Sequence, residues 1–202
     1  MSVTALLPVR TAAPGEPLLT VAAAKEHLRV EHSDEDDLIE ALCGAVEAYL
    51  DGFAGILGRA LVTQSWSRSF DCFPCGNRIA LPIGPLQDVD SVMYYDRDGN
   101  HLAFGSSNFH AVTDPLGPCI ILADLAQWPD TAVRPDAVTV TWTCGYGDAD
   151  EVPPPIAQAA KLMVGNLYEN REAVVTGPIT TELPLGAAML LAPFRVAMLG
   201  GA

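Results

Sequence analysis

Hydrophobic residues recur at helical spacing near both ends of the chain and at alternate positions in its middle. An amphipathic run follows Thr20, whose hydroxyl is a typical helix N-cap. Ser33 is expected to cap a second, longer helix, with four carboxylates of its first turn, Asp34–Asp37, at the positive end of the helix dipole. These runs predict helices within residues 20–57. Helical spacing returns over residues 153–172, after three consecutive prolines.

The middle of the chain has the pattern of β-strands. Between residues 60 and 144, short β-prone runs are separated by Pro, Gly, Asn and Asp. In the clearest run, residues 137–144, large apolar side chains alternate strictly with threonines. This alternation predicts a half-buried antiparallel strand with one apolar and one hydroxylated face.

Together the two periodicities predict an α+β fold. An N-terminal helical hairpin and C-terminal helices form an α-helical bundle, and an antiparallel β region is inserted between them. Residues 1–17, which are rich in Pro and have little periodicity, are expected to be an extended N-terminal arm. Residues 18–202 are expected to form a single domain with a β insert at 60–144 and an apolar C-terminal segment at 183–202.

Composition and charge narrow the function classes. Half of the 202 residues are hydrophobic, which excludes wholesale disorder. The formal net charge of −14 argues against a surface that grips duplex DNA and against a polybasic membrane anchor. The chain has no uncharged apolar run of 20 residues, and its N-terminus lacks the pattern of a secretory signal. We therefore expect a cytoplasmic location.

The candidates for chemistry are few. Cys72 and Cys75 have redox or half-zinc spacing, but no second pair completes a zinc site, and two loop thiols are the favoured interpretation. The acidic run at 31–40 fails the calcium-loop pattern, because the sixth position counted from Asp34 is Ile39 and not glycine. We expect no metal, no cofactor and no catalytic residue. A small cytoplasmic enzyme or redox protein that uses Cys72 and Cys75 is the alternative.

The C-terminal segment is almost uncharged. From Leu183 to the end, Arg195 is the sole charged side chain, in a chain that is otherwise strongly acidic. Such a segment either packs on its own core or completes its burial on another subunit or partner.

Several segments, in order, resemble one family. They are LTVAAAKEHLRVEHSDEDDLIEALCGAVEAYLDGFAG, then LVTQSW and LPIGPLQDVDSVMYYDRDG, then VTVTWTCGYGDADEVPPPIAQAAKLMVGNLYENRE and finally LPLGAAMLLAPFRV. Over about residues 18–197 the chain resembles the head–tail connector (adaptor) proteins of long-tailed bacteriophages and of the related gene transfer agents. The single domain at 18–202 would then be a connector domain.

The resemblance implies a structural protein without enzymatic activity. It implies a homo-oligomeric ring, usually of twelve subunits, beneath the portal protein at the capsid vertex. The ring would join the portal to a tail-side connector (stopper) or tail terminator protein and continue the channel, through which DNA passes without specific binding. The location would be the neck of a particle assembled in the bacterial cytoplasm. Phage, prophage and gene transfer agent remain alternatives.

The resemblance also suggests two sets of site residues. In the family the C-terminal segment commonly docks on the portal, and the candidates for that contact here are Leu185, Met189, Leu190 and Phe194. A second hypothesis places part of an acidic set toward the channel or a neighbouring subunit, because an acidic lumen repels passing DNA. That set is Glu31, Asp34, Glu35, Asp36 and Asp37. The alternative is a solvated helix cap.

Overall fold

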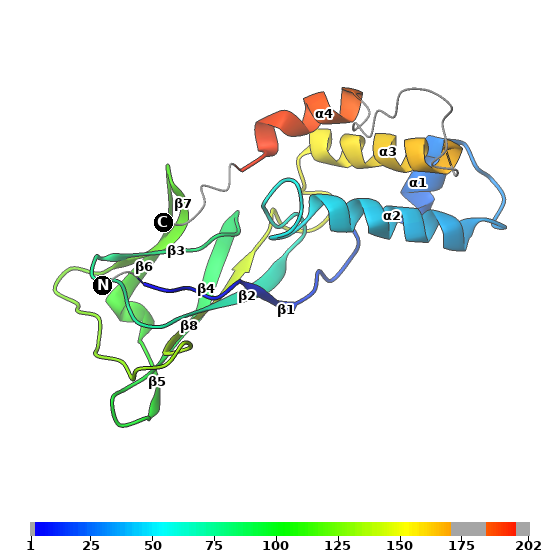
Figure 1. Cartoon of the computed structure of the whole chain (residues 1–202). Coiled ribbons are helices and arrows are strands. Elements are labelled where there is room, and N and C mark those ends of the chain that lie inside the picture. The colour runs from blue at the N-terminus through cyan, green and yellow to red at the C-terminus, as the bar shows by residue number, and fades with distance from the viewer. Residues whose placement is uncertain (1–2, 171–184, 197–202) are drawn as a thin grey trace, which may run out of the picture. The chain divides into compact units, whose positions relative to one another are not determined.

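The computed structural model describes residues 3–170 and 185–196. It contains helices and antiparallel strands, which confirms the predicted α+β class (Figure 1). The chain divides into two compact units. The first, here the β unit, comprises Met1–Gly15 and Thr63–Gly145, and the second, the helical unit, comprises Glu16–Val62 and Tyr146–Ala202. The sequence suggested an extended arm at residues 1–17 before a single domain. In the division into two units, Met1–Gly15 is grouped with the strands.

Four α-helices and a short 3₁₀ helix make up the described part of the helical unit. They are α1 (Val21–Leu28), α2 (Asp36–Leu50), α3 (Pro154–Glu169), α4 (Leu185–Leu191) and η2 (Ala192–Phe194). Thr20 caps α1 as predicted, since its Oγ1 accepts a hydrogen bond of 3.2 Å from the Ala23 amide. The longer helix predicted after Ser33 is present as α2, but its predicted cap was wrong. The N-cap of α2 is Glu35, so two carboxylates, Asp36 and Asp37, lie in the first turn instead of four.

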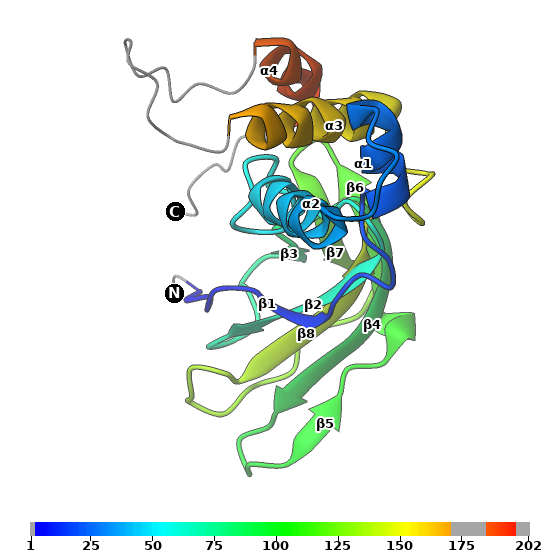
Figure 2. The same cartoon turned by 90° about the vertical axis from the view of Figure 1, so that its right-hand side faces the viewer.

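The core of the helical unit is built from one face of each helix. The buried side chains of α2 are Ile39, Cys43, Val46 and Leu50, which recur at spacings of four and three residues. They join the buried face of α3 and two residues of α4 in one apolar cluster. Figures 1 and 2 both show α3 between α2 and α4. Helix α3 is therefore the central layer of this unit.

The segment after α2 folds back tightly on the helix end. The buried carboxylate of Asp51 accepts a hydrogen bond of 2.8 Å from the Leu61 amide. The amide of Gly52 donates to the carbonyl of Arg59. At Gly55, an added Cβ would lie 2.4 Å from the carbonyl oxygen of Asp51, so only glycine fits this close approach.

The β unit contains two antiparallel sheets. The five-stranded sheet has the order β1-β2-β8-β4-β5, and the three-stranded sheet has the order β3-β7-β6. The strands are β1 (Val9–Ala12), β2 (Gln64–Phe70), β3 (Arg78–Ala80), β4 (Leu86–Tyr95), β5 (His101–Ala103), β6 (Phe109–Asp114), β7 (Gly117–Leu122) and β8 (Val138–Cys144). A 3₁₀ helix, η1 (Ser106–Asn108), precedes β6.

Strand β8 lies at the centre of the five-stranded sheet and confirms the predicted alternation. Its valines, Trp142 and Cys144 are fully buried. Trp142 also donates a hydrogen bond of 3.1 Å from its indole nitrogen to the carbonyl of Ile83. On the opposite face, hydroxyls pair with those of β2: Ser65 with Thr143 at 3.1 Å and Ser69 with Thr139 at 2.9 Å.

Two strands lack a clear sequence signal. All four residues of β1 and all three of β5 are exposed, so neither has the alternation that marks a half-buried strand. Strand β1 forms because it pairs with β2, with Val9 opposite Ser67. The pairing partner follows it by more than 50 residues, which a local pattern does not reveal.

An ion pair fixes the turn between β6 and β7. Arg78 on β3 donates to both carboxylate oxygens of Asp114, at 2.9 and 3.1 Å. The same carboxylate accepts a hydrogen bond of 2.8 Å from the Leu116 amide. These bonds stabilise the charged form, and the hydrogen bond from Arg78 contributes most to lowering the pKa of Asp114 below its ordinary value.

Replacing Arg78 tests this arrangement. In Arg78→Met the pKa of Asp114 should rise toward the ordinary aspartate value of about 3.9, as measured by NMR titration. Because the folded pKa is lowered, the pair stabilises the fold above the unfolded pKa, and this contribution is lost as pH falls through the folded pKa. The control is Asp96, whose pKa is lowered mainly by hydrogen bonds from Asn100 and should not move. An unchanged Asp114 pKa would contradict the assignment.

Candidate docking surfaces

Helix α4 has two faces with opposite roles. Ala187 and Leu191 lie four residues apart and are fully buried in the core of the helical unit. Leu185 and Met189, also four residues apart, are 79% and 70% exposed. Residues at i and i+4 share a helix face, so one face anchors α4 and another presents two large apolar side chains outward.

The other two predicted contact residues are placed differently. Leu190 and Phe194 are partly buried and pack against the core of the helical unit. After η2, the Val196 amide donates a hydrogen bond of 3.0 Å to the carbonyl of Leu57, which ties this end of the described chain to the same unit. Of the four predicted residues, Leu185 and Met189 are therefore the two that are exposed.

The acidic set at the start of α2 is only partly free to face a partner. Asp36 forms an ion pair with Lys25 at 2.6 Å, and Glu35 accepts a hydrogen bond from the hydroxyl of Tyr168. The carboxylate of Asp34 lies 3.8 Å from His32. Asp34 is exposed, as are Glu31 and Asp37. The sequence brings all five residues together, but the structure commits Glu35 and Asp36 to contacts inside the helical unit.

The two cysteines of the redox alternative lie in the connection between β2 and β3. Both are free thiols, Cys72 half-buried and Cys75 exposed. Burial raises the pKa of Cys72, and its thiol donates to the Asp71 carboxylate at 3.4 Å, which raises that pKa further. A reactive cysteine needs the opposite shift. Within residues 3–170 and 185–196, no cluster of His, Cys, Asp or Glu has the size to hold a metal ion.

The chain resembles known proteins in its structure. No protein-family model matches the chain, and no curated protein matches its sequence. The neck of an empty gene transfer agent particle, computed with C6 symmetry, contains a chain that is 23% identical and superposes with a TM-score of 0.76. The alignment covers 97% of this chain and 99% of that one. The chain has the fold of a gene transfer agent neck protein.

Two further structures share this neck-protein fold with the same identity and coverage. The neck of a native particle computed with C12 symmetry gives a TM-score of 0.69, and the virion of a native gene transfer agent gives 0.68. The coverage includes both the helical unit and the β unit, so the likeness is not confined to one common motif. The likeness to gene transfer agent particle proteins expected from the sequence is thereby confirmed at the level of the fold. Among the described residues of this chain, no helix is long and apolar enough to cross a membrane.

The two faces of α4 can be separated by substitution. Leu191→Ala should lower the free energy of unfolding by about 2–5 kcal/mol, because it leaves a cavity in the core. Met189→Ala on the exposed face should change it by about 0.5 kcal/mol or less. Urea denaturation followed by circular dichroism measures both values. Equal losses would show that α4 does not pack through Ala187 and Leu191.

Proposed function

We propose that this protein is a structural subunit of the neck of a phage or gene transfer agent particle, where it forms a ring beneath the portal. The full-length match to neck chains is the observation that carries the proposal. The C6 and C12 symmetry with which those necks were computed supports a homo-oligomeric ring, in which we infer twelve subunits. The ring would join the portal to a tail-side connector or terminator protein and continue the DNA channel.

The surfaces of the protein suit this role better than catalysis. Leu185 and Met189 are exposed on one face of α4, while Ala187 and Leu191 on the other face hold the helix in the core. The exposed face is thus fixed before a partner binds, as in a preformed docking site. The net charge of −14 disfavours binding to DNA, as a channel subunit requires. The raised pKa of Cys72 disfavours the redox alternative. We therefore propose a non-enzymatic adaptor located in the particle neck.

The portal contact is tested with the exposed residues of α4. Deleting the whole segment would also remove Ala187 and Leu191 from the core, so loss of binding would have two explanations. Leu185→Asp combined with Met189→Asp keeps both anchors and places charge on the docking face. We expect this variant to lose co-elution with portal rings on a sizing column with light-scattering detection, while its melting temperature stays near that of the wild type.

The control is Leu125→Asp, which alters a fully exposed leucine of the β unit. It should co-elute with portal at the stoichiometry of the wild type. Normal portal binding by the α4 double variant would remove Leu185 and Met189 from the contact. If the wild-type protein itself never binds portal, the adaptor role is wrong.

The acidic set is tested at its exposed members. Glu31→Gln, Asp34→Asn and Asp37→Asn remove three charges and spare the pairs made by Glu35 and Asp36. If these carboxylates face the channel or a neighbouring subunit, the triple variant should assemble less completely or deliver less DNA per particle. Particle yield and DNA transfer frequency measure this. Unchanged values would leave the exposed carboxylates as a solvated helix cap.

A further inference from the structure

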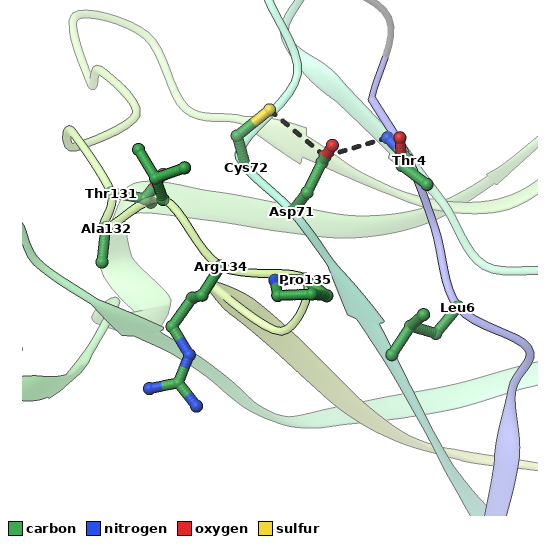
Figure 3. Close-up of a pocket in the computed structure, with 9 residues that line it drawn as sticks. Thr4, Leu6, Asp71, Cys72, Thr131, Ala132, Arg134 and Pro135 are labelled. Carbon is green, nitrogen blue, oxygen red and sulfur yellow. Dashed lines mark hydrogen bonds between the residues drawn. The ribbon is translucent and has the colours of Figure 1, made fainter.

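The β unit contains an open cavity of about 800 Å³, which falls in the size range of ligand pockets. One wall is the N-terminal segment with Thr4 and Leu6 beside Asp71 and Cys72. The other is the connection between β7 and β8, at Thr131–Pro135 (Figure 3). The lining is mainly apolar. Of these residues, the sequence singled out Cys72 alone, as part of the redox alternative, and gave no sign of a cavity.

The charged groups of the cavity are already engaged. The Asp71 carboxylate accepts hydrogen bonds from the Thr4 amide at 2.9 Å and the Cys72 thiol at 3.4 Å, both drawn in Figure 3. Arg134 donates to both carboxylate oxygens of Asp136, at 2.6 and 2.8 Å, and its guanidinium lies 3.8 Å from the Tyr95 ring centroid. These contacts hold both charged side chains in place. Because the surface that lines the cavity is mainly apolar, the cavity is suited to an apolar, uncharged occupant.

Both walls are held in place before anything binds. The Leu6 amide donates to the Ser69 carbonyl at 2.9 Å, and the Ala132 amide donates to the Tyr95 carbonyl at 2.9 Å. At the rim, Val133 is fully exposed and Leu6 is nearly half exposed. A preformed cavity with apolar residues on its rim loses little conformational entropy when an apolar group enters it.

The same unit carries a group of matching chemistry. Leu116 is 76% exposed at the tip of the turn between β6 and β7, in the uncharged sequence Pro115-Leu116-Gly117. The neighbouring Asp114 is neutralised by Arg78, and it also holds the Leu116 amide. The turn is thus a fixed, uncharged projection with an apolar side chain at its end.

We propose that the cavity receives the Leu116 turn of a neighbouring copy of this chain. The inference rests on the ring of the proposed function. In a closed ring each subunit contacts its neighbours through two different surfaces, one complementary to the other. The cavity and the Leu116 turn are such a pair, since one is a preformed apolar hollow and the other an uncharged apolar projection. Repeating this contact from copy to copy would close the ring.

A native cysteine makes the contact testable by crosslinking. Leu116→Cys in a Cys75→Ser background places a new thiol on the turn, and Cys72 lines the cavity. Diamide oxidises the two thiols to a disulfide and itself takes up the two protons and two electrons. Such a bond requires Cα atoms within about 7 Å. In rings assembled on portal, we expect a ladder of covalently linked copies on a non-reducing gel, extending to the full ring.

Two matched variants control the experiment. Adding Cys72→Ser should abolish the ladder, because the thiol in the cavity is gone. Leu125→Cys places the thiol at another exposed leucine, on the connection between β7 and β8 instead of the Leu116 turn, and should give no ladder. A ladder that persists without Cys72 would overturn the proposal.

Charge substitutions provide a second readout. Leu116→Asp and Val133→Asp each place a charge on one side of the contact, at exposed positions where the fold should tolerate it. We expect both to shift the light-scattering mass from the ring toward the monomer, whereas Leu125→Asp should keep the ring mass. Unchanged melting temperatures would separate this loss from unfolding.

The outcomes distinguish this inference from the function on which it rests. If the wild-type protein forms no ring with portal, the proposed function fails and the inference fails with it. If rings form but the thiol at position 116 does not crosslink to Cys72 and Leu116→Asp assembles normally, only the inference is overturned. Crosslinking of Cys72 to portal or to a tail-side protein would assign the cavity to that partner instead.

Discussion

The helical unit depends on the burial of α3 between α2 and α4. Ile156 and Ala160 on α3 belong to the same apolar cluster as Leu50 on α2 and Leu191 on α4. Helix α4 has only seven residues, too few to be stable alone in water, so its conformation comes from this packing. The outward direction of Met189 follows, because the helix can bury Leu191 only by turning the opposite face to solvent. Core packing thus produces the exposed face on which the proposed portal contact depends.

In the β unit, several charged side chains are paired with each other. Arg134 and Asp136 bond to each other, and Asp114 is bound to Arg78, so the surfaces beside them are locally neutral. Internal pairing leaves apolar groups such as Val133 as the features that a partner would meet. A strongly acidic chain can therefore still offer apolar docking sites, because net charge acts over a longer range than the contact itself. Mutual repulsion between subunits would be offset at short range by apolar burial.

Fold and function rest on different observations here. The TM-score of 0.76 over 97% of the chain shows a neck-protein fold, but at 23% identity it shows the fold alone. A fold can host several roles, and a role depends on particular surfaces. For this chain the candidate surfaces are the exposed face of α4, the carboxylates near the start of α2, and the cavity and Leu116 turn of the β unit. Each has a separate role in the proposals above and can be altered by substitutions at its exposed residues.

By itself the sequence determined the helices, caps and strands whose signal is local, either a hydrogen-bond partner a few residues away or a periodic pattern of buried side chains. The Thr20 cap, the alternation of β8 and the long helices were all readable, because each signal lies within a few residues. The sequence predicted Ser33 as the N-cap of α2, whereas the structure has Glu35 there, because several consecutive polar residues could each cap the helix. Only the tertiary structure decided the edge strand β1, the inward face of α4 and the apolar cavity. Those features join residues dozens of positions apart, and which side chains remain exposed is known only when the packing partners are in place.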